Sequence, residues 1–140
     1  MRAFDTDVLS DLLRGHQPYR DRLAGLDPAA YAVPVVTAEE VARGWLAAIR
    51  KAEPDRRRPD RLLAAYSFFA RDLTALSGYR LLPYTAAAAA RVDEWRAAKV
   101  RVGTQDLRIA AIAVAHDAIL VTRNVRDFDQ VPGLQLEVWT

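Results

Sequence analysis

The sequence predicts an α/β protein with a central, mainly parallel sheet of about five strands. Short apolar runs alternate with longer segments whose apolar residues recur at helical spacing, which is the pattern of a doubly wound sheet. The run Ala118-Ile-Leu-Val has no polar alternation, as expected for a strand covered on both faces. The segment before it is rich in small residues that would let a helix lie close to a sheet, namely Ala110, Ala111, Ala113 and Ala115.

The first unit is a strand, a turn and a helix. Met1 to Phe4 is a short apolar run, and helical spacing then links Val8, Leu9, Leu12 and Leu13. Thr6 is the expected N-cap, so Asp5 falls at the carboxyl end of the first strand. A turn-forming aspartate would also explain Asp5, and Asp7 suits the first turn of a helix because it compensates the dipole.

A second unit follows a polar connection, Gly15 to Pro28, which includes a short helix or loop around Tyr19 to Leu26. Ala32 to Thr37 is predicted as a strand. Its Pro34 cannot donate a ladder hydrogen bond, which places this residue at the beginning of the strand or on an edge. A helix is expected to open at Thr37, with its buried side marked by Val41, Trp45, Ala48 and Ala52.

Glu40 has two interpretations. Thr37 and Glu40 have the spacing of a capping box, which by itself explains a glutamate at this position. A functional role is the alternative, because Glu40 follows a strand's carboxyl end and Gly44 leaves the same helix face clear. Glu39 is the weaker candidate, since it lies about 100° round the helix from Glu40.

The middle of the chain has a hydrophilic break and a long helix. Glu53 to Pro59 contains arginines that could contact phosphates, although a charge run of this kind is more often a solvated loop: Arg56, Arg57 and Arg58, with Arg61 just beyond. Asp60 to Ser77 is predicted as a helix. Its apolar face is wide enough to serve both the core and a partner, and comprises Leu62, Leu63, Tyr66, Phe69, Leu73 and Leu76.

The remaining units continue the alternation. Tyr79 to Leu82 is predicted as a strand, and Thr85 caps a helix that continues to about Lys99. Thr104 is the expected N-cap of the next helix. Asp106 then lies in its first turn, where compensation of the dipole would explain it.

The last units are a strand, a loop and a second strand. Ile119 to Thr122 is the predicted strand, and the loop after it carries Asn124 and Asp127. Leu134 to Val138 alternates like a half-exposed strand.

Composition narrows the class of protein. The 140 residues are expected to form one domain, since 51% of them are hydrophobic. The absence of cysteine excludes disulfides and thiolate zinc sites, and no segment near the start has the length of a signal peptide or membrane span. We therefore expect a cytoplasmic protein. The net charge of +2 permits either an ordinary mixed-charge surface or a basic surface around an acidic pocket, which would suit a polyanion.

Four acids carry the chemical hypothesis: Asp5, Glu40, Asp106 and Asp127. Each lies at a strand's carboxyl end or near a helix start, and a parallel sheet brings such positions to one edge. Carboxylates grouped in this way repel one another unless cations compensate them. Mg²⁺ or Mn²⁺ is the expected cofactor, because both prefer oxygen ligands and no His/Cys set for zinc is present. The inferred reaction is metal-dependent hydrolysis of a phosphodiester.

Three segments also carry a family resemblance: FDTDVLS, VVTAEEVARG and GTQDLRIAAIAVAHDAILVTRNVRDFDQVPGLQLEVW. With them, essentially the whole chain resembles the PIN-domain ribonucleases, most closely the VapC-type toxins of bacterial toxin–antitoxin pairs. That resemblance implies a three-layer α/β/α domain and a Mg²⁺-dependent endoribonuclease. It also implies that Asp5, Glu40 and Asp106 are metal-site acids, with Asp127 as the fourth.

The family resemblance has two departures. Some members carry the fourth acid where this chain has Asn124, so Asn124 is an alternative ligand to Asp127. The first motif usually reads D-T-N, whereas this chain has Asp7 in the third place. The resemblance further implies a homodimer, a small antitoxin that obstructs the site, and structured RNA such as tRNA as substrate.

Two other functions compete with the nuclease. FDTDVL matches the start of haloacid-dehalogenase-like phosphatases, with Asp5 as nucleophile and Asp7 as acid/base, but the required lysine is missing from a strand end because Lys51 and Lys99 fall at helix ends. The other is a catalytically silent domain that binds RNA or a partner.

Overall fold

The computed structural model describes residues 1–140 and has a five-stranded sheet of order β3-β2-β1-β4-β5. All four pairs of neighbouring strands are parallel. The strands are β1 (Arg2–Phe4), β2 (Tyr31–Pro34), β3 (Leu81–Leu82), β4 (Ile119–Thr122) and β5 (Leu136–Val138). The parallel α/β sheet expected from the sequence is thus confirmed.

Six α-helices and two short 3-10 turns join the strands. They are α1 (Thr6–Arg14), α2 (Gln17–Ala24), η1 (Pro28–Ala30), α3 (Val35–Ala52), α4 (Pro59–Leu76), α5 (Ala86–Ala97), α6 (Thr104–Ala115) and η2 (Val125–Asp127). None of the helices combines the length and the apolar character that a membrane crossing requires.

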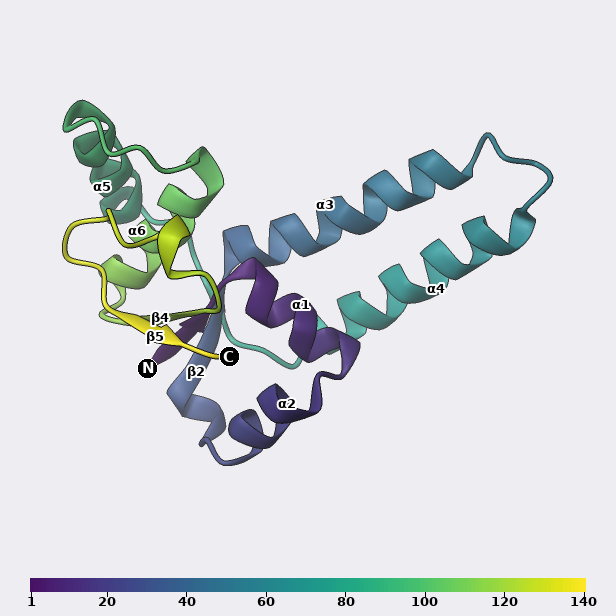
Figure 1. Ribbon diagram of the computed structural model, residues 1–140, viewed down its shortest axis with the longest axis horizontal. Helices are drawn as coiled ribbons and strands as arrows, with labels where there is room; N and C mark the ends of the chain where they lie inside the picture. The colour runs from purple at the N-terminus through teal and green to yellow at the C-terminus, as the bar shows by residue number, and fades with distance from the viewer.

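Two hydrophobic cores lie on opposite faces of the sheet. Ala3, Ala32 and Leu120 pack with residues of α5 and α6 on one face. Their chain neighbours Phe4, Val33 and Val121 pack with residues of α1 and α2 on the other. Because successive strand residues point to opposite faces, this division gives the three layers α/β/α. Figure 1 shows α1 and α2 on one side of the strands and α5 and α6 on the other.

Helices α3 and α4 extend away from this body as a long hairpin arm (Figure 1). Trp45 Nε1 donates a 2.6 Å hydrogen bond to Asp72 Oδ2, which joins the two helices near the base of the arm. The apolar face expected for α4 is mostly outside the core: Leu76 is buried, whereas Leu63, Tyr66 and Leu73 are exposed. Periodicity correctly located the apolar residues but could not tell which of them the core covers.

The arginine-rich segment lies at the tip of this arm. Arg58 Nη2 lies 3.0 Å from Asp60 Oδ2, and Arg61 Nη1 lies 3.9 Å from Asp55 Oδ2. These exposed ion pairs agree with the solvated-loop interpretation of this segment.

The second strand ends earlier than predicted. Pro34 is the last residue of β2 and the N-cap of α3, so Val35, Val36 and Thr37 are helical. The predictions of a strand to Thr37, of Pro34 at a strand start or edge, and of a capping box were therefore wrong. Ala3 pairs with Ala32, so the parallel ladder would continue with a hydrogen bond from the nitrogen of residue 34 to the Phe4 carbonyl. Residue 34 is a proline and has no N–H, so it cannot donate this bond.

Thr37 compensates for that missing donor. Its hydroxyl is completely buried and donates a 3.0 Å hydrogen bond to the Phe4 carbonyl oxygen. Thr37, which the sequence pattern predicts as a helix cap, thus links the first turn of α3 to the end of β1 by a hydrogen bond. This tie fixes where α3 begins relative to Asp5.

Two further caps differ from expectation. Asp5, not Thr6, is the N-cap of α1, because Asp5 Oδ1 accepts a 2.8 Å hydrogen bond from the Val8 N–H. Gly103, not Thr104, is the N-cap of α6, because Thr104 is already the first residue of the helix. The Thr104 hydroxyl instead accepts a hydrogen bond from Arg96 Nη2. The predicted cap at Thr85 is confirmed, since its hydroxyl accepts from the Ala88 N–H.

Candidate active site

The candidate acids lie toward the carboxyl edge of the sheet. Asp5 directly follows β1, Glu40 lies on α3 beyond the end of β2, and Asp127 is in the η2 turn after β4. Asp106 lies in the first turn of α6. The central position of β1, between β2 and β4, explains how the chain brings these positions to one edge.

Asp5 is the most constrained of the four acids. Asp5 is only 4% exposed, and its Oδ1 accepts the capping hydrogen bond from the Val8 N–H. Burial raises the pKa of Asp5 to about 6, although the nearby Thr122 side chain and the Val8 N–H oppose the rise. A buried carboxylate of this kind is costly to ionise without a cation beside it.

Glu40 is held from α1. Thr6 Oγ1 donates a 2.7 Å hydrogen bond to Glu40 Oε1, so the helix that Asp5 caps also orients this carboxylate. Glu40 is six residues into α3 and satisfies no backbone N–H of that helix. The capping-box explanation for Glu40 is therefore removed.

The charges of the other acids raise the pKa of Asp106. Burial is the largest cause that raises its pKa to about 6, followed by the negative charges of Glu40, Asp127, Asp5 and Asp7. The side chains predicted from the sequence therefore share one electrostatic environment. As they stand, no three His, Cys, Asp or Glu side chains are arranged so that they could hold a metal ion.

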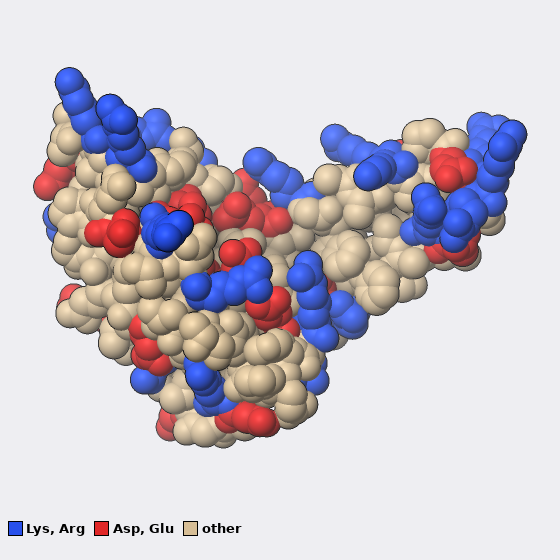
Figure 2. Space-filling model, viewed as in Figure 1, with Lys and Arg blue, Asp and Glu red and all other residues tan.

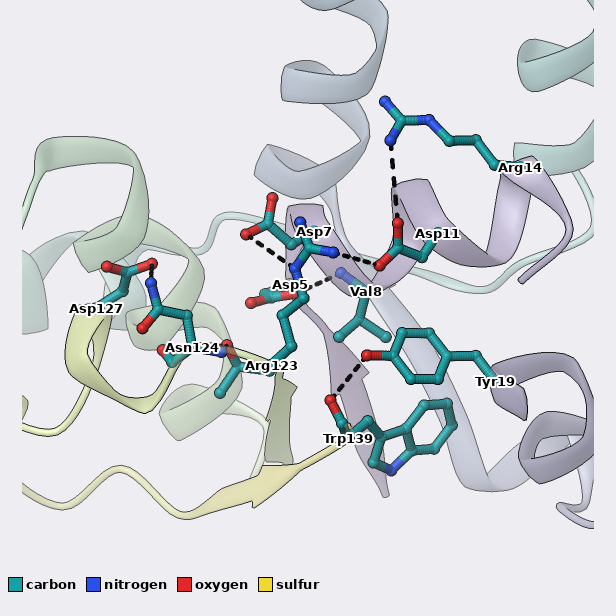
Figure 3. Close-up of polar contacts among 11 residues, drawn as sticks. Asp5, Asp7, Val8, Asp11, Arg14, Tyr19, Arg123, Asn124, Asp127 and Trp139 are labelled. Atoms are coloured by element: carbon teal, nitrogen blue, oxygen red, sulfur yellow. Dashed lines mark hydrogen bonds and ion pairs between the residues drawn. The ribbon is translucent and has the colours of Figure 1, made fainter. Parts of the chain in front are cut away.

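Asn124 and Asp127 are bonded to each other. Asn124 Nδ2 donates a 2.9 Å hydrogen bond to Asp127 Oδ2, and Figure 3 shows the pair on the side of Asp5 opposite to Asp11. Both residues are exposed. Their contact makes the two side chains a unit, so which of them completes the site stays a prediction.

The acidic region is bordered by basic side chains. Figure 2 shows Asp and Glu gathered in the hollow between the body and the arm, with Lys and Arg around it and at the tip of the arm. The acids in this hollow thus have basic side chains beside them, although Asp and Glu also lie elsewhere on this face.

Sequence reasoning missed three polar residues of this region. Thr6 was assigned to a cap, and Thr122 and Arg123 were assigned no role. Thr122 is completely buried and lies within hydrogen-bonding reach of Asp5. Arg123 forms ion pairs with Asp7 and Asp11. A polar residue at the end of a buried strand was the only available signal for Thr122.

The chain is similar to several known proteins. It is 33% identical over 85 residues to the tRNA(fMet)-specific endonuclease VapC of Salmonella typhimurium, a match that covers 58% of this chain and 60% of that protein. The matches to curated relatives span between 28% and 60% of the length of those relatives.

Two solved structures share nearly the full length. VapBC2 from Rickettsia felis, bound to a DNA fragment from its promoter, has a TM-score of 0.76 at 21% identity, and the match covers 99% of this chain and 98% of that one. A toxin–antitoxin complex from Klebsiella pneumoniae has a TM-score of 0.69 at 27% identity, with 100% and 97% covered.

The family comparison agrees with the fold. The model of the PIN domain matches residues 3–134, which include all four candidate carboxylates and the sheet except for Arg2 and β5. The chain belongs to the PIN domain family.

Proposed function

We propose that this protein is a metal-dependent endoribonuclease that hydrolyses RNA phosphodiester bonds, and that it is the toxin of a toxin–antitoxin pair. The observation that carries the proposal is the raised pKa of Asp106, which burial raises most and which the charges of Glu40, Asp127, Asp5 and Asp7 raise further. Acids brought together at such a cost indicate a site for cations. The names of the Salmonella and Klebsiella relatives support the same function.

The donor chemistry fits Mg²⁺, with Mn²⁺ as a substitute. All candidate donors are oxygens, and the acids repel one another in a partly buried region. Asp5, Glu40 and Asp106 would hold the ion, with Asp127 or Asn124 as the fourth group. The chemistry that a divalent cation held there would supply is polarisation of the phosphodiester and a lower pKa for the attacking water.

The protein's own groups position that chemistry. The Val8 N–H fixes the Asp5 carboxylate, and the Thr6 hydroxyl fixes Glu40. Asp5 and Asp106 must both lose their protons to serve as ligands, and their pKa values of about 6 make that loss possible at neutral pH. We therefore expect activity to fall as the pH drops below 6.

The exposed apolar residues of the arm and the names of the relatives support proposals for the binding partners. Leu63, Tyr66 and Leu73 are 69%, 52% and 46% exposed on α4, an apolar surface that a monomer in water leaves uncovered at a cost. We propose that a small antitoxin covers part of this surface and that the toxin is a homodimer. Structured RNA, such as tRNA, is the proposed substrate, and residues 1–140 form the single nuclease domain.

The phosphatase alternative has no support in the site. Asp7 Oδ2 lies 3.7 Å from Arg123 Nε instead of being free to act as an acid, and Lys51 lies on the arm at the end of α3. The silent-domain alternative makes a distinct prediction. Such a domain would bind RNA without cleaving it in any divalent cation.

The test is cleavage of a bacterial tRNA fraction by the purified protein with Mg²⁺, with Mn²⁺ and with EDTA. We expect cleavage in either metal, none in EDTA, and none with Asp106→Asn. Asp93→Asn is the matched control, because Asp93 is an exposed aspartate on α5. A wild-type protein that binds tRNA but leaves it intact in both metals would favour the silent domain. Toxicity on expression, relieved by the neighbouring reading frame, tests the antitoxin.

A further inference from the structure

Arg123 is held in place beside the acidic site. It is the first residue after β4, and its Nη1 donates a 2.7 Å hydrogen bond to Asp11 Oδ2. Its Nε lies 3.7 Å from Asp7 Oδ2. Figure 3 shows the guanidinium between Asp7 and Asp11, close to Asp5. Two carboxylates from one helix thus fix the direction of an arginine that starts on a strand.

Asp11 serves as the anchor for two arginines. Its side chain is only 16% exposed, and its other oxygen, Oδ1, lies 4.0 Å from Arg14 Nη1. The side chains of Arg123 and Arg14 are 47% and 72% exposed. The anchor is therefore largely covered, whereas the two guanidinium groups reach solvent.

Arg123 keeps donors for another molecule. Among its five N–H groups, only one on Nη1 makes a hydrogen bond within the protein. Both N–H groups of Nη2 are without a partner in the protein, and a planar guanidinium with such donors can bind the oxygens of a phosphate. Its ion pair with Asp7, two residues after Asp5, places the guanidinium at the rim of the acidic site, as Figure 3 shows.

We propose that Arg123, oriented by Asp11 and Asp7, binds a phosphate of the RNA backbone next to the bond that is cleaved, and that Arg14 extends this contact along α1. This inference rests on the proposed function. It also gives Asp7 a role, since the acid adds an anchor for the arginine. A purely structural Arg123 would need only to neutralise Asp7 and Asp11.

Salt dependence of RNA binding separates these two roles. Binding of a bacterial tRNA fraction is measured in EDTA at several concentrations of monovalent salt, because each lost phosphate contact reduces the slope of log K against log salt by about one. We expect Arg123→Gln to weaken binding and to lower the slope by about one. Arg80→Gln is the matched control, because Arg80 is an exposed arginine just before β3, at the opposite edge of the sheet.

Two further variants sharpen the test. Arg123→Lys is expected to keep the slope but to bind several-fold more weakly, because an ammonium lacks the fork of donors. Asp11→Asn is expected to weaken binding although it removes a negative charge, since both arginines lose their anchor. Simple charge repulsion predicts the opposite result for Asp11→Asn.

The outcomes that overturn the inference are distinct from failure of the proposed function. A wild-type protein that neither binds nor cleaves tRNA removes both. A wild-type protein that binds, together with an Arg123→Gln variant of the same slope and affinity, assigns Arg123 a structural role only. Thermal melting checks that each variant folds, and if Arg123→Gln does not, equal affinity of Arg123→Lys and wild type overturns the inference.

Discussion

Thr6 Oγ1 lies 2.7 Å from Glu40 Oε1, and this hydrogen bond joins the first residue of α1 to α3 across 34 positions of sequence. Asp5, the residue before Thr6, caps the same helix. Two successive residues therefore act on the site in different ways: one contributes a carboxylate and the other orients a carboxylate from another helix.

Removing the Thr6 hydroxyl should reduce cleavage without unfolding the protein. A hydrogen bond to a charged group contributes about 1.5–3 kcal/mol, so Thr6→Val is expected to lower kcat/KM roughly 10-fold or more. Thr6→Ser keeps the donor and should retain most of the activity. Initial rates of tRNA cleavage check both variants, and equal rates for Thr6→Val and wild type would mean that Glu40 needs no orientation.

The hydrogen bond between Asn124 and Asp127 makes their roles separable by substitution. If Asp127 supplies the fourth carboxylate, Asp127→Asn should lower the cleavage rate by roughly 10-fold or more. Asn124→Ala should then cost less, because it removes only the donor that steadies Asp127. Cleavage rates across a Mn²⁺ titration decide between the two, and a larger loss for Asn124→Ala would assign the fourth position to Asn124.

Divalent cations should stabilise the folded protein through the same acids. A ligand that binds only the folded state, at a concentration about 100 times its Kd, increases the free energy of unfolding by about 2.7 kcal/mol. This increase raises Tm by several degrees for a chain of this size. Saturating Mn²⁺ is expected to have this effect on the wild type and on Asp93→Asn, and to have little effect on Asp106→Asn. Thermal melts with Mn²⁺ and with EDTA provide the measurement. A full Tm shift in Asp106→Asn would place the metal elsewhere.

The sequence was sufficient for the order of the elements and for the positions of Asp5 and Asp106, because buried strands and amphipathic helices leave local patterns. It was not sufficient for Thr6, Thr37 and Arg123. Each of these makes its hydrogen bond to a residue more than thirty positions away, and only the packing of α1 and α3 on the sheet creates the contact. Thr37 even carried a misleading local pattern, since its spacing to Glu40 is that of a capping box.

Neutralising Asp5 should stabilise the protein at neutral pH. Burial raises the pKa of Asp5 from 3.8 to about 6, so its ionised form destabilises the fold. One unit of pKa corresponds to 1.36 kcal/mol, and Asp5→Asn should therefore raise the free energy of unfolding by about 3 kcal/mol at pH 8 in EDTA. Asparagine still caps a helix, whereas Asp5→Ala also loses the cap, which costs about 1 kcal/mol.

The pH dependence of this gain has a definite sign. Because the pKa of Asp5 is higher in the folded state, the folded protein binds the proton more tightly, and this contribution is present below pH 3.8 and lost as the pH rises through 6. The stability gap between Asp5→Asn and wild type should thus be small near pH 4 and widen up to about pH 7. Urea denaturation in EDTA across this range measures the gap. A gap that stays constant with pH would mean that Asp5 ionises in the folded protein as easily as in the unfolded chain, and the acidic site would then need no cation to relieve it.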